Sequence, residues 1–567
     1  MDQKNFFSSL KTKFANLPRA NVLAGASAAI AVAFVGYLLL STSAASWFAS
    51  LNPADGTLSG NVSVINDASG KVLQFGSPST GGGGTDPAGS WPSAPPAKIC
   101  TNENGVLTAP PTPPANAITV PAGDNSKFDF SKSNTKYWFA TGVHTLGTGQ
   151  YAQIEPASDS EYIGAPGAIL DGQKVNLYAF TQHATNVRIA YLEIRNFGKA
   201  GDNNNEAVVN HDAGDNWTIE YNNIHNVAGA GVFLGSNNVV RYNCLKDNGQ
   251  YGFSMYKDPV PGDSSIKNIV LDHNEIAGNN TDNWEAKIDG CGCTGGGKFW
   301  DTKGAVVSNN YVHDNLSVAL WADTNDIDFL FEGNWIENNQ AEAIWYEISY
   351  NAAIRNNVIK GNAKQSGGEF AKNGDNFPEA AVYISESGGD SRVQSKTIGS
   401  PVIDISHNLF IDNWSGITLW ENADRYCNSP ANTSDGYCTM VNPNVTLKSC
   451  ASGIIANEPY YSDCRWKTKN VTISNNEFHH NPANVGNCDP KYCGHMAILS
   501  NYGTYPSWSP YKGNVIQKAI TYNQNNKWSN NKYFGTWSFV SESTDISQNW
   551  NTWRGGPFNQ DAGSSMQ

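Results

Sequence analysis

A short motif centred on asparagine recurs along this chain and restricts its fold more than any other feature. In every copy an apolar residue stands three positions before the asparagine, and another stands two positions after it. The copies centre on Asn222, Asn243, Asn274, Asn310, Asn334, Asn357, Asn408 and Asn476. Seven of the eight copies have a second asparagine five residues later: Asn248, Asn279, Asn315, Asn339, Asn362, Asn413 and Asn481.

The spacing of the copies predicts a solenoid of short β-coils. The shortest intervals are 21, 23 and 24 residues, and the longer ones indicate insertions. A coil of this length cannot bury its apolar side alone, so coils stack and their strands pair with the coils above and below. Asparagines at the corners then form ladders, with side-chain amides about 4.8 Å apart. In a helical solenoid, apolar residues would instead recur with a period of about 3.6 residues.

The motif resembles that of the right-handed parallel β-helix repeat proteins of the pectate-lyase-like superfamily. The resemblance covers roughly 128–533, and residues 162–172 are similar to the entry coils of such proteins. It implies an all-β, right-handed parallel β-helix and a bias toward extracellular polysaccharides, with lyases, hydrolases and epimerases among the members. The arginine motifs of the best-known pectate lyases and the paired aspartates of polygalacturonases are missing, so no particular reaction follows.

The N-terminus predicts a membrane anchor. Val22 to Leu40 is uncharged and long enough, at about 1.5 Å per helical residue, to cross the hydrocarbon core. Basic residues precede it, which keeps the N-terminus in the cytoplasm and exports the rest. The alternative is a cleaved signal peptide with Ser43 and Ala45 at its cleavage site. The net charge of -14, with no basic stripe, argues against nucleic acid as a partner.

These features give the predicted organisation of the chain. It begins with a cytoplasmic tail at 1–21 and a transmembrane helix at 22–40. An extracellular, flexible Gly/Ser/Pro-rich spacer with a short β-hairpin follows at 41–115. The β-helix occupies 116–545, and a C-terminal tail ends the chain at 546–567.

The ten cysteines fit an oxidising compartment. Local spacing predicts the pairs Cys427 with Cys438, Cys450 with Cys464, and Cys488 with Cys493. The sequence alone does not pair Cys100, Cys244, Cys291 and Cys293. A metal site built from His479, His480, Cys488, Cys493 and His495 is the alternative, which we consider weaker than disulfides because tight metal-ligand spacing is missing.

Counting from the ladder asparagine sorts the side chains by face. Positions ten and twelve are mostly apolar and are predicted to point inward; in the coil of Asn408 they are Thr418 and Trp420. Positions eleven and thirteen then point outward. Position thirteen is occupied by Asp323, Glu347 and Glu421. Position eleven is occupied by Trp321 and Trp345, which are expected to be exposed side by side on neighbouring coils. Glu386 and Asp301 join the acidic row with a register uncertain by one residue.

A row of like charges repels itself, which favours a functional reading. Asp323, Glu347, Glu386 and Glu421 are the predicted catalytic residues, because paired carboxyl groups perform acid–base chemistry on glycosidic bonds. The same row could hold Ca²⁺, the possible cofactor; no other metal is predicted. Trp321 and Trp345 are predicted to bind sugar rings, with His313 and Lys298 as further substrate-binding candidates. Lys298 lies in an insertion, 280–304, that could roof the row or supply a base.

Two functions remain open from the sequence. The first is a membrane-anchored, surface-exposed β-helix that binds an extracellular polysaccharide and cleaves or modifies it, as a lyase or a glycoside hydrolase. The second is a non-catalytic adhesin or cell-envelope element that uses the β-helix as a rigid display rod. An enzyme needs its carboxylates in a groove walled by the insertions at 280–304 and 361–378, whereas an adhesin could leave this face open.

Overall fold

The computed structural model describes residues 62–67, 70–75, 90–199, 206–255, 257, 264–288, 294–422, 425–426, 445–446, 448–450, 454–486, 488–500, 514–544 and 547–567. The chain forms two compact units, Met1–Pro87 and Ala88–Gln567. In the first unit, β1 (Val62–Asp67) and β2 (Gly70–Phe75) pair as an antiparallel hairpin. The predicted membrane span at 22–40 lies outside the described residues, and none of the helices within them has the length and apolar character needed to cross a bilayer.

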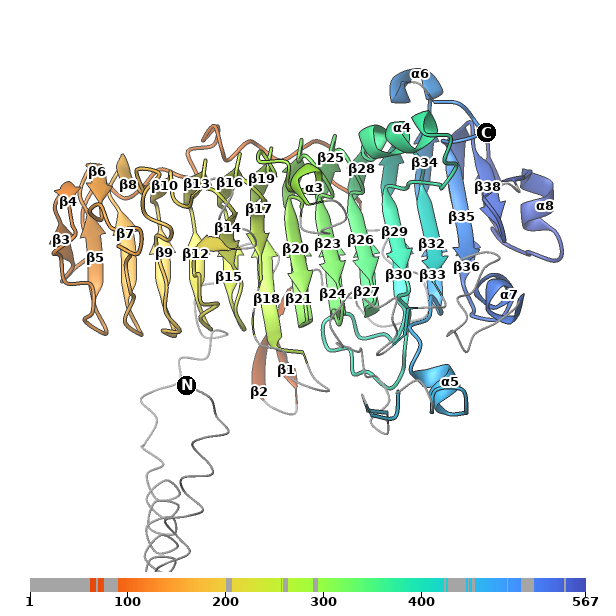
Figure 1. Cartoon of the computed structure of the whole chain (residues 1–567), viewed down its shortest axis with the longest axis horizontal. Helices are drawn as coiled ribbons and strands as arrows, with labels where there is room; N and C mark the ends of the chain where they lie inside the picture. Colours follow the sequence, from red (N-terminus) through yellow and green to blue (C-terminus); the bar gives the residue numbers. More distant parts are fainter. Residues whose placement is uncertain are drawn as a thin grey trace, which may run out of the picture. The chain divides into compact units, whose positions relative to one another are not determined.

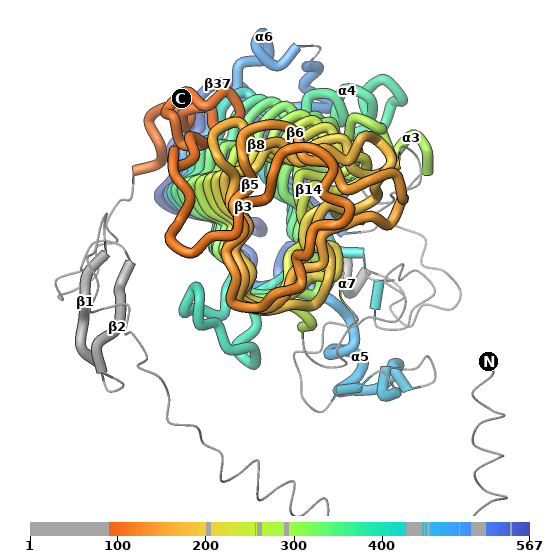
Figure 2. The backbone as a smooth tube through the Cα atoms, turned by 90° about the vertical axis from the view of Figure 1, so that its left-hand side faces the viewer, coloured from red at the N-terminus to blue at the C-terminus, as the bar shows by residue number. Residues whose placement is uncertain are grey.

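The second unit is a parallel β-helix whose coils supply strands to three sheets (Figures 1 and 2). Sheet I consists of β3 (Ile118–Val120), β5 (Lys136–Phe139), β7 (Glu161–Gly164), β9 (Arg188–Ala190), β12 (Thr218–Glu220), β15 (Val239–Arg241), β18 (Ile266–Asp272), β21 (Thr302–Ser308), β24 (Ile327–Glu332), β27 (Tyr350–Arg355), β30 (Ile403–Ser406), β33 (Val471–Ser474) and β36 (Lys527–Ser529).

Sheets II and III follow sheet I within each complete coil. Sheet II consists of β4 (Gly123–Asp124), β6 (Gly142–Thr145), β8 (Ala168–Asp171), β10 (Glu193–Arg195), β13 (Asn223–His225), β16 (Cys244–Lys246), β19 (Glu275–Ala277), β22 (Tyr311–His313), β25 (Trp335–Glu337), β28 (Val358–Lys360), β31 (Leu409–Ile411), β34 (Glu477–His480), β37 (Lys532–Gly535) and β40 (Ser565–Met566). Sheet III consists of β11 (Ala207–Val209), β14 (Ala230–Phe233), β17 (Tyr251–Ser254), β20 (Gly297–Trp300), β23 (Leu320–Asp323), β26 (Ile344–Glu347), β29 (Val382–Ser385), β32 (Ile417–Glu421), β35 (His495–Ser500), β38 (Ser538–Ser541) and β39 (Ser547–Gln548).

Short helices lie in the insertions and at the C-terminal end of the β-helix (Figure 1). They are α3 (Trp284–Lys287), α4 (Lys364–Lys372), α5 (Tyr460–Asp463), α6 (Pro482–Val485), α7 (Asn514–Tyr522) and α8 (Trp550–Arg554).

The ladder asparagines occupy the corners between sheets, as predicted. The residue before the ladder asparagine adopts a left-handed conformation, with φ of 58° at Tyr221 and 54° at Tyr242. This conformation is unfavourable for an L-residue by about 1–2 kcal/mol. The asparagine amide offsets that cost: Asn243 donates to Ile219 O at 2.8 Å and to the next ladder member, Asn274, at 3.0 Å. The corner therefore depends on a side-chain amide that donates in one direction along the ladder and accepts in the other.

The two ladders differ in extent from the sequence prediction. The first continues past Asn476 to Asn531, whose Oδ1 accepts from the Asn476 backbone at 3.0 Å. The second ends at Asn413, because Asn481 is exposed and instead caps α6 by accepting from Ala483 N at 3.1 Å. Inside the corners, the apolar residues that precede the first ladder are fully buried: Ile219, Val240, Leu271, Val307, Phe331, Ile354, Ile405 and Ile473.

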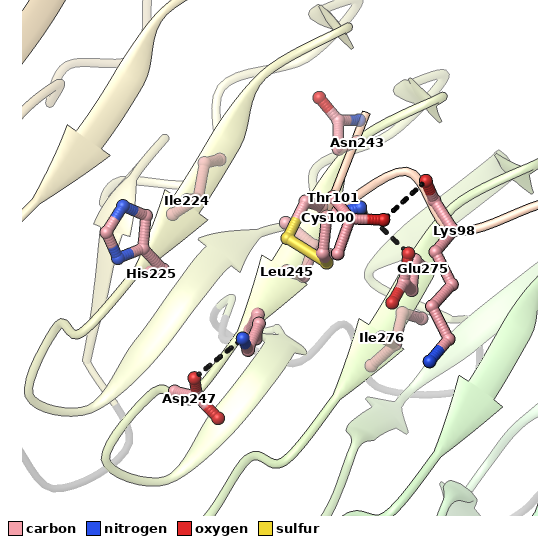
Figure 3. Close-up of a disulfide and its surroundings, with 12 residues drawn as sticks. Lys98, Cys100, Thr101, Ile224, His225, Asn243, Leu245, Asp247, Glu275 and Ile276 are labelled. Carbon is pink, nitrogen blue, oxygen red and sulfur yellow. Dashed lines mark hydrogen bonds and ion pairs between the residues drawn. A yellow bond between two sulfur atoms is a disulfide. The ribbon is translucent and has the colours of Figure 1, made fainter. Parts of the chain in front are cut away.

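Residues 90–117, which we call the strap, lie against the β-helix, although the sequence prediction placed most of them in a flexible spacer. Trp91 packs with Tyr311 and Trp335 of sheet II. Further along the strap, Cys100 forms a disulfide with Cys244 on β16, and its backbone N–H donates to Glu275 at 2.8 Å (Figure 3). The strap therefore has apolar, covalent and hydrogen-bonded attachments.

The segment predicted as a C-terminal tail completes the end of the β-helix. Its strand β40 pairs with β37 in sheet II, and α8 places Trp553 in the core. Asp561 is fully buried and accepts from Trp553 Nε1 at 2.7 Å and from Tyr533 OH at 3.0 Å. This closure covers the last coil, which would otherwise present an open edge.

Candidate functional site on the outer face of sheet III

The strand register brings together two of the four predicted carboxylates. Asp323 on β23 pairs directly with Glu347 on β26, so their side chains project from adjacent strands on the outer face of sheet III. On the next strands the equivalent positions are Ser385 and Trp420. Asp323 and Glu347 are therefore direct neighbours, on adjacent strands whose backbones lie about 4.8 Å apart.

Glu386 and Glu421 lie one residue beyond this row, so the prediction of one continuous file was wrong. The corner leading to β32 is one residue shorter than the equivalent corner before β26, because Ile417 follows Asn413 by four positions whereas Ile344 follows Asn339 by five. The shift reverses the faces of β32: Ile417 and Leu419 point into the core, and the predicted inward residues Thr418 and Trp420 do not.

The two displaced glutamates are fully buried, Glu386 in the turn after β29 and Glu421 at the end of β32. Glu386 accepts from Asn422 N at 2.6 Å and ion-pairs with Arg425 at 3.1 Å. Glu421 ion-pairs with Arg465 at 3.2 Å and accepts from Thr468 N at 3.0 Å. These bonds hold the ends of β29 and β32 against later segments of the chain, so both glutamates have a structural role.

Aromatic side chains form a stack along the same face. The rings of Trp321 and Trp345 are 4.3 Å apart and nearly parallel, at 3°. Tyr383 continues the row at 5.2 Å from Trp345, and Lys298 Nζ lies 4.0 Å from the Trp321 ring on the other side. Trp321 is only 6% exposed, against the expectation of two exposed rings, whereas Trp345 is half-buried. The rings cover each other's faces because neighbouring strands stack them.

Lys298 belongs to sheet III itself and not to a roof over it. It stands on β20 opposite Trp321, and its ammonium forms an ion pair with Asp323 at 2.8 Å. The same register places Trp300 opposite Asp323 and leaves Asp301 one residue beyond the row, where it accepts from Ser265 N at 3.1 Å. Lys298 therefore reaches the carboxyl pair and Asp301 does not join it.

Glu347 lies in an unusual electrostatic setting. Its side chain is 6% exposed, one oxygen accepts from Trp321 Nε1 at 3.1 Å, and the other contacts Arg425. Burial raises the pKa of Glu347 to about 7, against the opposing charge of Arg425. Asp323 is more exposed, at 18%, and its partner is Lys298 at 2.8 Å. Two neighbouring carboxyl groups thus occupy unlike environments.

The repeat motif did not identify several residues that lie near this pair. Arg425 comes from the long segment between β32 and β33, which carries no motif. Glu342 and Glu379 are buried beside the row, and burial raises the pKa of both, that of Glu379 to about 7. Phe377, from the insertion at 361–378, contacts Tyr383 and Trp420, so this insertion covers one end of the aromatic row.

His313 is not brought to the carboxyl pair. It lies on β22 of sheet II, where Nε2 bonds Glu275 at 3.1 Å and Nδ1 bonds Asp314 at 2.7 Å. Burial works against the imidazolium, but these two carboxylates raise the pKa of His313 overall. Its contacts brace the region beneath the strap, since Glu275 also receives the Cys100 N–H.

The predicted acidic row does not assemble a calcium site among the residues that the structure describes. The one group of three or more metal-ligating side chains found there is His480, Cys488 and Cys493. Asp323, Glu347, Glu386 and Glu421 instead face Lys298, Arg425 and Arg465, and Ca²⁺ would have to compete with those cations.

The structure contains two of the three predicted local disulfides, Cys450–Cys464 and Cys488–Cys493. Cys427, Cys438, Cys291 and Cys293 lie outside the described residues. The Cys100–Cys244 bond joins two residues that the sequence left unpaired.

Comparison with known families agrees with the observed architecture. A family model described as "Right handed beta helix region" matches residues 207–398. Together with the three parallel sheets, this match confirms a right-handed parallel β-helix repeat protein. A search of curated proteins finds no significant match.

Solved structures of similar fold include three carbohydrate enzymes. The A-module of the Azotobacter vinelandii mannuronan C-5 epimerase AlgE6 is 12% identical, with a TM-score of 0.35, over 64% of this chain and 83% of that one. The catalytic unit of a GH87 alpha-1,3-glucanase from Streptomyces thermodiastaticus strain HF3-3 is 13% identical, with a TM-score of 0.41, over 66% of this chain and 61% of that one. The periplasmic alginate epimerase AlgG is 11% identical, with a TM-score of 0.37, over 64% of this chain and 78% of that one. Likenesses this distant carry no argument about what this chain does.

Proposed function

We propose that this protein is a membrane-anchored, surface-exposed β-helix that binds an extracellular polysaccharide and cleaves or modifies it on the outer face of sheet III. The observation that carries the proposal is the pair Asp323 and Glu347, adjacent in register but held in unlike environments. Glycosidic chemistry uses such a pair, with one carboxyl group protonated and the other ionised.

The two carboxyl groups have distinct roles in this proposal. Glu347, with its pKa raised to about 7, holds a proton near neutral pH and donates it to the leaving glycosidic oxygen. Asp323, in its ion pair with Lys298, supplies negative charge next to the sugar carbon or activates the attacking group. Arg425 contacts Glu347. When a sugar oxygen approaches, the Arg425 side chain has to move aside or bind the sugar together with Glu347.

Sugar binding is assigned to the same face. Trp345 is half-buried, and Tyr383 continues its row, so ring edges line the strip beside Glu347. Aromatic side chains are common partners for the apolar faces of sugars. The N-terminal segment at 22–40 would hold this face outside the membrane, joined through the segment before the strap.

A second function rests on a specific observation. All four predicted carboxylates have cationic partners, and the Trp321 and Trp345 rings stack on each other. Such bracing suits a rigid adhesin or cell-envelope element that displays its surface without turnover.

A polysaccharide screen separates the two functions. The full-length chain in detergent is tested for glycan binding and depolymerisation, with and without Ca²⁺, beside the Asp323→Asn/Glu347→Gln double variant. The enzyme proposal predicts turnover that the double variant abolishes and that Glu332→Gln, on sheet I, preserves. An unsaturated product that absorbs in the ultraviolet would identify a lyase, and a new reducing end without it a hydrolase. Binding without turnover, equal in the double variant, would favour the adhesin, and neither binding nor turnover would reject both.

A further inference from the structure

Two cysteines and a histidine meet at the corner between sheets II and III near the C-terminal end. His480 ends β34, α6 follows it, and the next turn brings Cys488 and Cys493 back over the same corner. His480 and Cys493 are each 3% exposed. Cys488 is partly buried. The corner is distant in sequence from the carboxyl pair.

The ligand atoms of these three residues are already close together. His480 Nε2 lies 3.7 Å from Cys488 Sγ, and all three ligand atoms lie within 4.8 Å of one another. Zinc bonds of about 2.0–2.3 Å in tetrahedral geometry require ligand atoms roughly 3.3–3.8 Å apart. The separation of His480 Nε2 and Cys488 Sγ already fits this range, whereas the two sulfurs are bonded to each other and have to move apart when the disulfide is reduced.

The surroundings hold the three residues in place. The carbonyl of Asp489 accepts from the backbone N–H of Tyr492 at 2.8 Å and of Cys493 at 3.1 Å, which closes the turn. His495 Nε2 bonds the carbonyl of Pro490 at 2.9 Å, so this histidine supports the turn and does not reach for a ligand. At Gly494, a Cβ would lie only 2.9 Å from His480 Cε1, so glycine leaves the space that the imidazole fills.

The His480 ring points into the corner, where it lies beside the backbone of Thr536. The neighbouring His479 differs, because strand alternation turns it outward: it stacks on Phe534 at 4.5 Å and bonds Glu477 at 2.7 Å. Of the five residues in the zinc alternative considered from sequence, the structure selects three.

We infer that the Cys488–Cys493 disulfide conceals a zinc site, which His480 and the two thiolates form when the disulfide is reduced. The ligands are His480 Nε2, Cys488 Sγ and Cys493 Sγ, with water in the fourth position. The inference is independent of the proposed function, since no residue of the carboxyl pair takes part.

The exchange between the two states balances with an external dithiol as reductant. The dithiol donates two electrons, the S–S bond breaks, and the dithiol becomes a disulfide. The two cysteine sulfurs separate as thiolates, two protons enter the solvent, and both thiolates bind Zn²⁺. Reoxidation by a disulfide-forming oxidant re-forms the S–S bond and releases the metal.

Cobalt is the probe for this site, because Co²⁺ in a tetrahedral thiolate site absorbs visible light. The full-length chain is reduced with a phosphine, freed of reductant under argon and titrated with Co²⁺, followed by displacement with Zn²⁺. We expect one tetrahedral Co²⁺ per chain that depends on Cys488 and Cys493, and no such band in the oxidised chain. His480→Gln should weaken binding by about tenfold or more.

Two matched variants control this experiment. His479→Gln changes the adjacent histidine that faces away, and Cys450→Ser/Cys464→Ser removes a different disulfide; both should keep the full cobalt signal. Circular dichroism checks that each variant is folded, and Cys488→Ser replaces His480→Gln if the latter does not fold. A cobalt band that survives Cys488→Ser/Cys493→Ser, or wild-type affinity in folded His480→Gln, would overturn the inference. So would a reduced, folded chain that binds no Co²⁺.

Discussion

Asn334 illustrates how a single side chain holds a corner of the β-helix. It is fully buried, and its amide donates to Val307 O at 2.8 Å and to Asn357 Oδ1 at 3.0 Å. Its own Oδ1 accepts from the backbone and the side chain of Asn310, both at 3.0 Å. No apolar residue of similar size satisfies these groups, which explains why the motif could be read from the sequence.

Replacement of this residue should be costly. Asn334→Ala leaves two buried donors of Asn310 without an acceptor, and each such orphan costs about 1–3 kcal/mol. We expect the free energy of unfolding to fall by about 3 kcal/mol, measured by urea denaturation. Asn373→Ala, at an exposed helix end with φ of -84°, should change it by less than about 0.5 kcal/mol. Equal effects of the two variants would contradict a structural role for the ladder.

Glu347 should leave a pH signature on stability. Burial gives it a folded pKa of about 7, above its ordinary value of 4.5, so the folded chain binds more protons than the unfolded chain between these values. The contribution of Glu347 to stability therefore falls as pH rises from 4.5 to about 7. Glu347→Gln should make this decline shallower, by about 3 kcal/mol at most. Denaturation at both ends of this pH window tests it, and an unchanged slope would contradict the assigned pKa.

At the scale of elements, the sequence predicts a strand more reliably than its register. The alternation before and after the ladder asparagines correctly placed Trp321, Asp323, Trp345 and Glu347 on one face of sheet III. It failed at β32, because one residue fewer in the preceding corner turns every side chain over. The length of a corner depends on its backbone conformation. The motif specifies nothing about the residues that follow its second asparagine.

The strap is the second element that the sequence could not place. Its composition is rich in proline and small residues, which is typical of a spacer. What fixes it is a contact between distant segments: Cys100 and Cys244 are 144 residues apart. Pairings of this kind depend on the finished fold, so among the described residues cysteine spacing alone correctly gave only the local pairs Cys450–Cys464 and Cys488–Cys493.

Loss of the strap disulfide should destabilise the β-helix more than loss of a local one. In the chain-entropy account, closing a loop of this length contributes about 5 kcal/mol. Cys100→Ser/Cys244→Ser should therefore lower the thermal midpoint and expose the strap to limited proteolysis. Cys450→Ser/Cys464→Ser, with a separation of 14 residues, should cost about 3 kcal/mol at most. The opposite order would show that the strap contributes little to stability.

At the scale of the whole molecule, the repeat predicted the β-helix, but only half of the proposed site. Asp323, Glu347 and Trp345 follow from periodicity, since they stand on strands that the motif predicts, whereas Lys298 was expected in an insertion and lies on β20. Arg425 does not, because it belongs to an insertion without a repeat and reaches Glu347 only through the fold. Raised carboxyl pKa values likewise depend on burial by segments far away in the sequence.

The anchor proposal has its own test at this scale. Val22–Leu40 should keep the full-length chain in the membrane fraction after an alkaline wash, with its N-terminus intact. Deletion of 22–40 should release the chain from the membrane. Edman sequencing or intact-mass analysis of the exported protein checks the alternative: a mature chain that begins just after Ala45 would show a cleaved signal peptide instead of an anchor.

The most direct test of the proposed activity compares single carboxyl variants at one rate. With the polysaccharide that the wild type degrades, the initial rate at which new chain ends form is measured for the wild type, Glu347→Gln and Glu332→Gln. Glu332 is the matched control, because it is ion-paired with Arg355 at 2.9 Å on sheet I. The account predicts that Glu347→Gln lowers the rate by about 100-fold or more with glycan binding retained, while Glu332→Gln matches the wild type. A wild-type rate in Glu347→Gln would show that the outer face of sheet III is not where this chain acts.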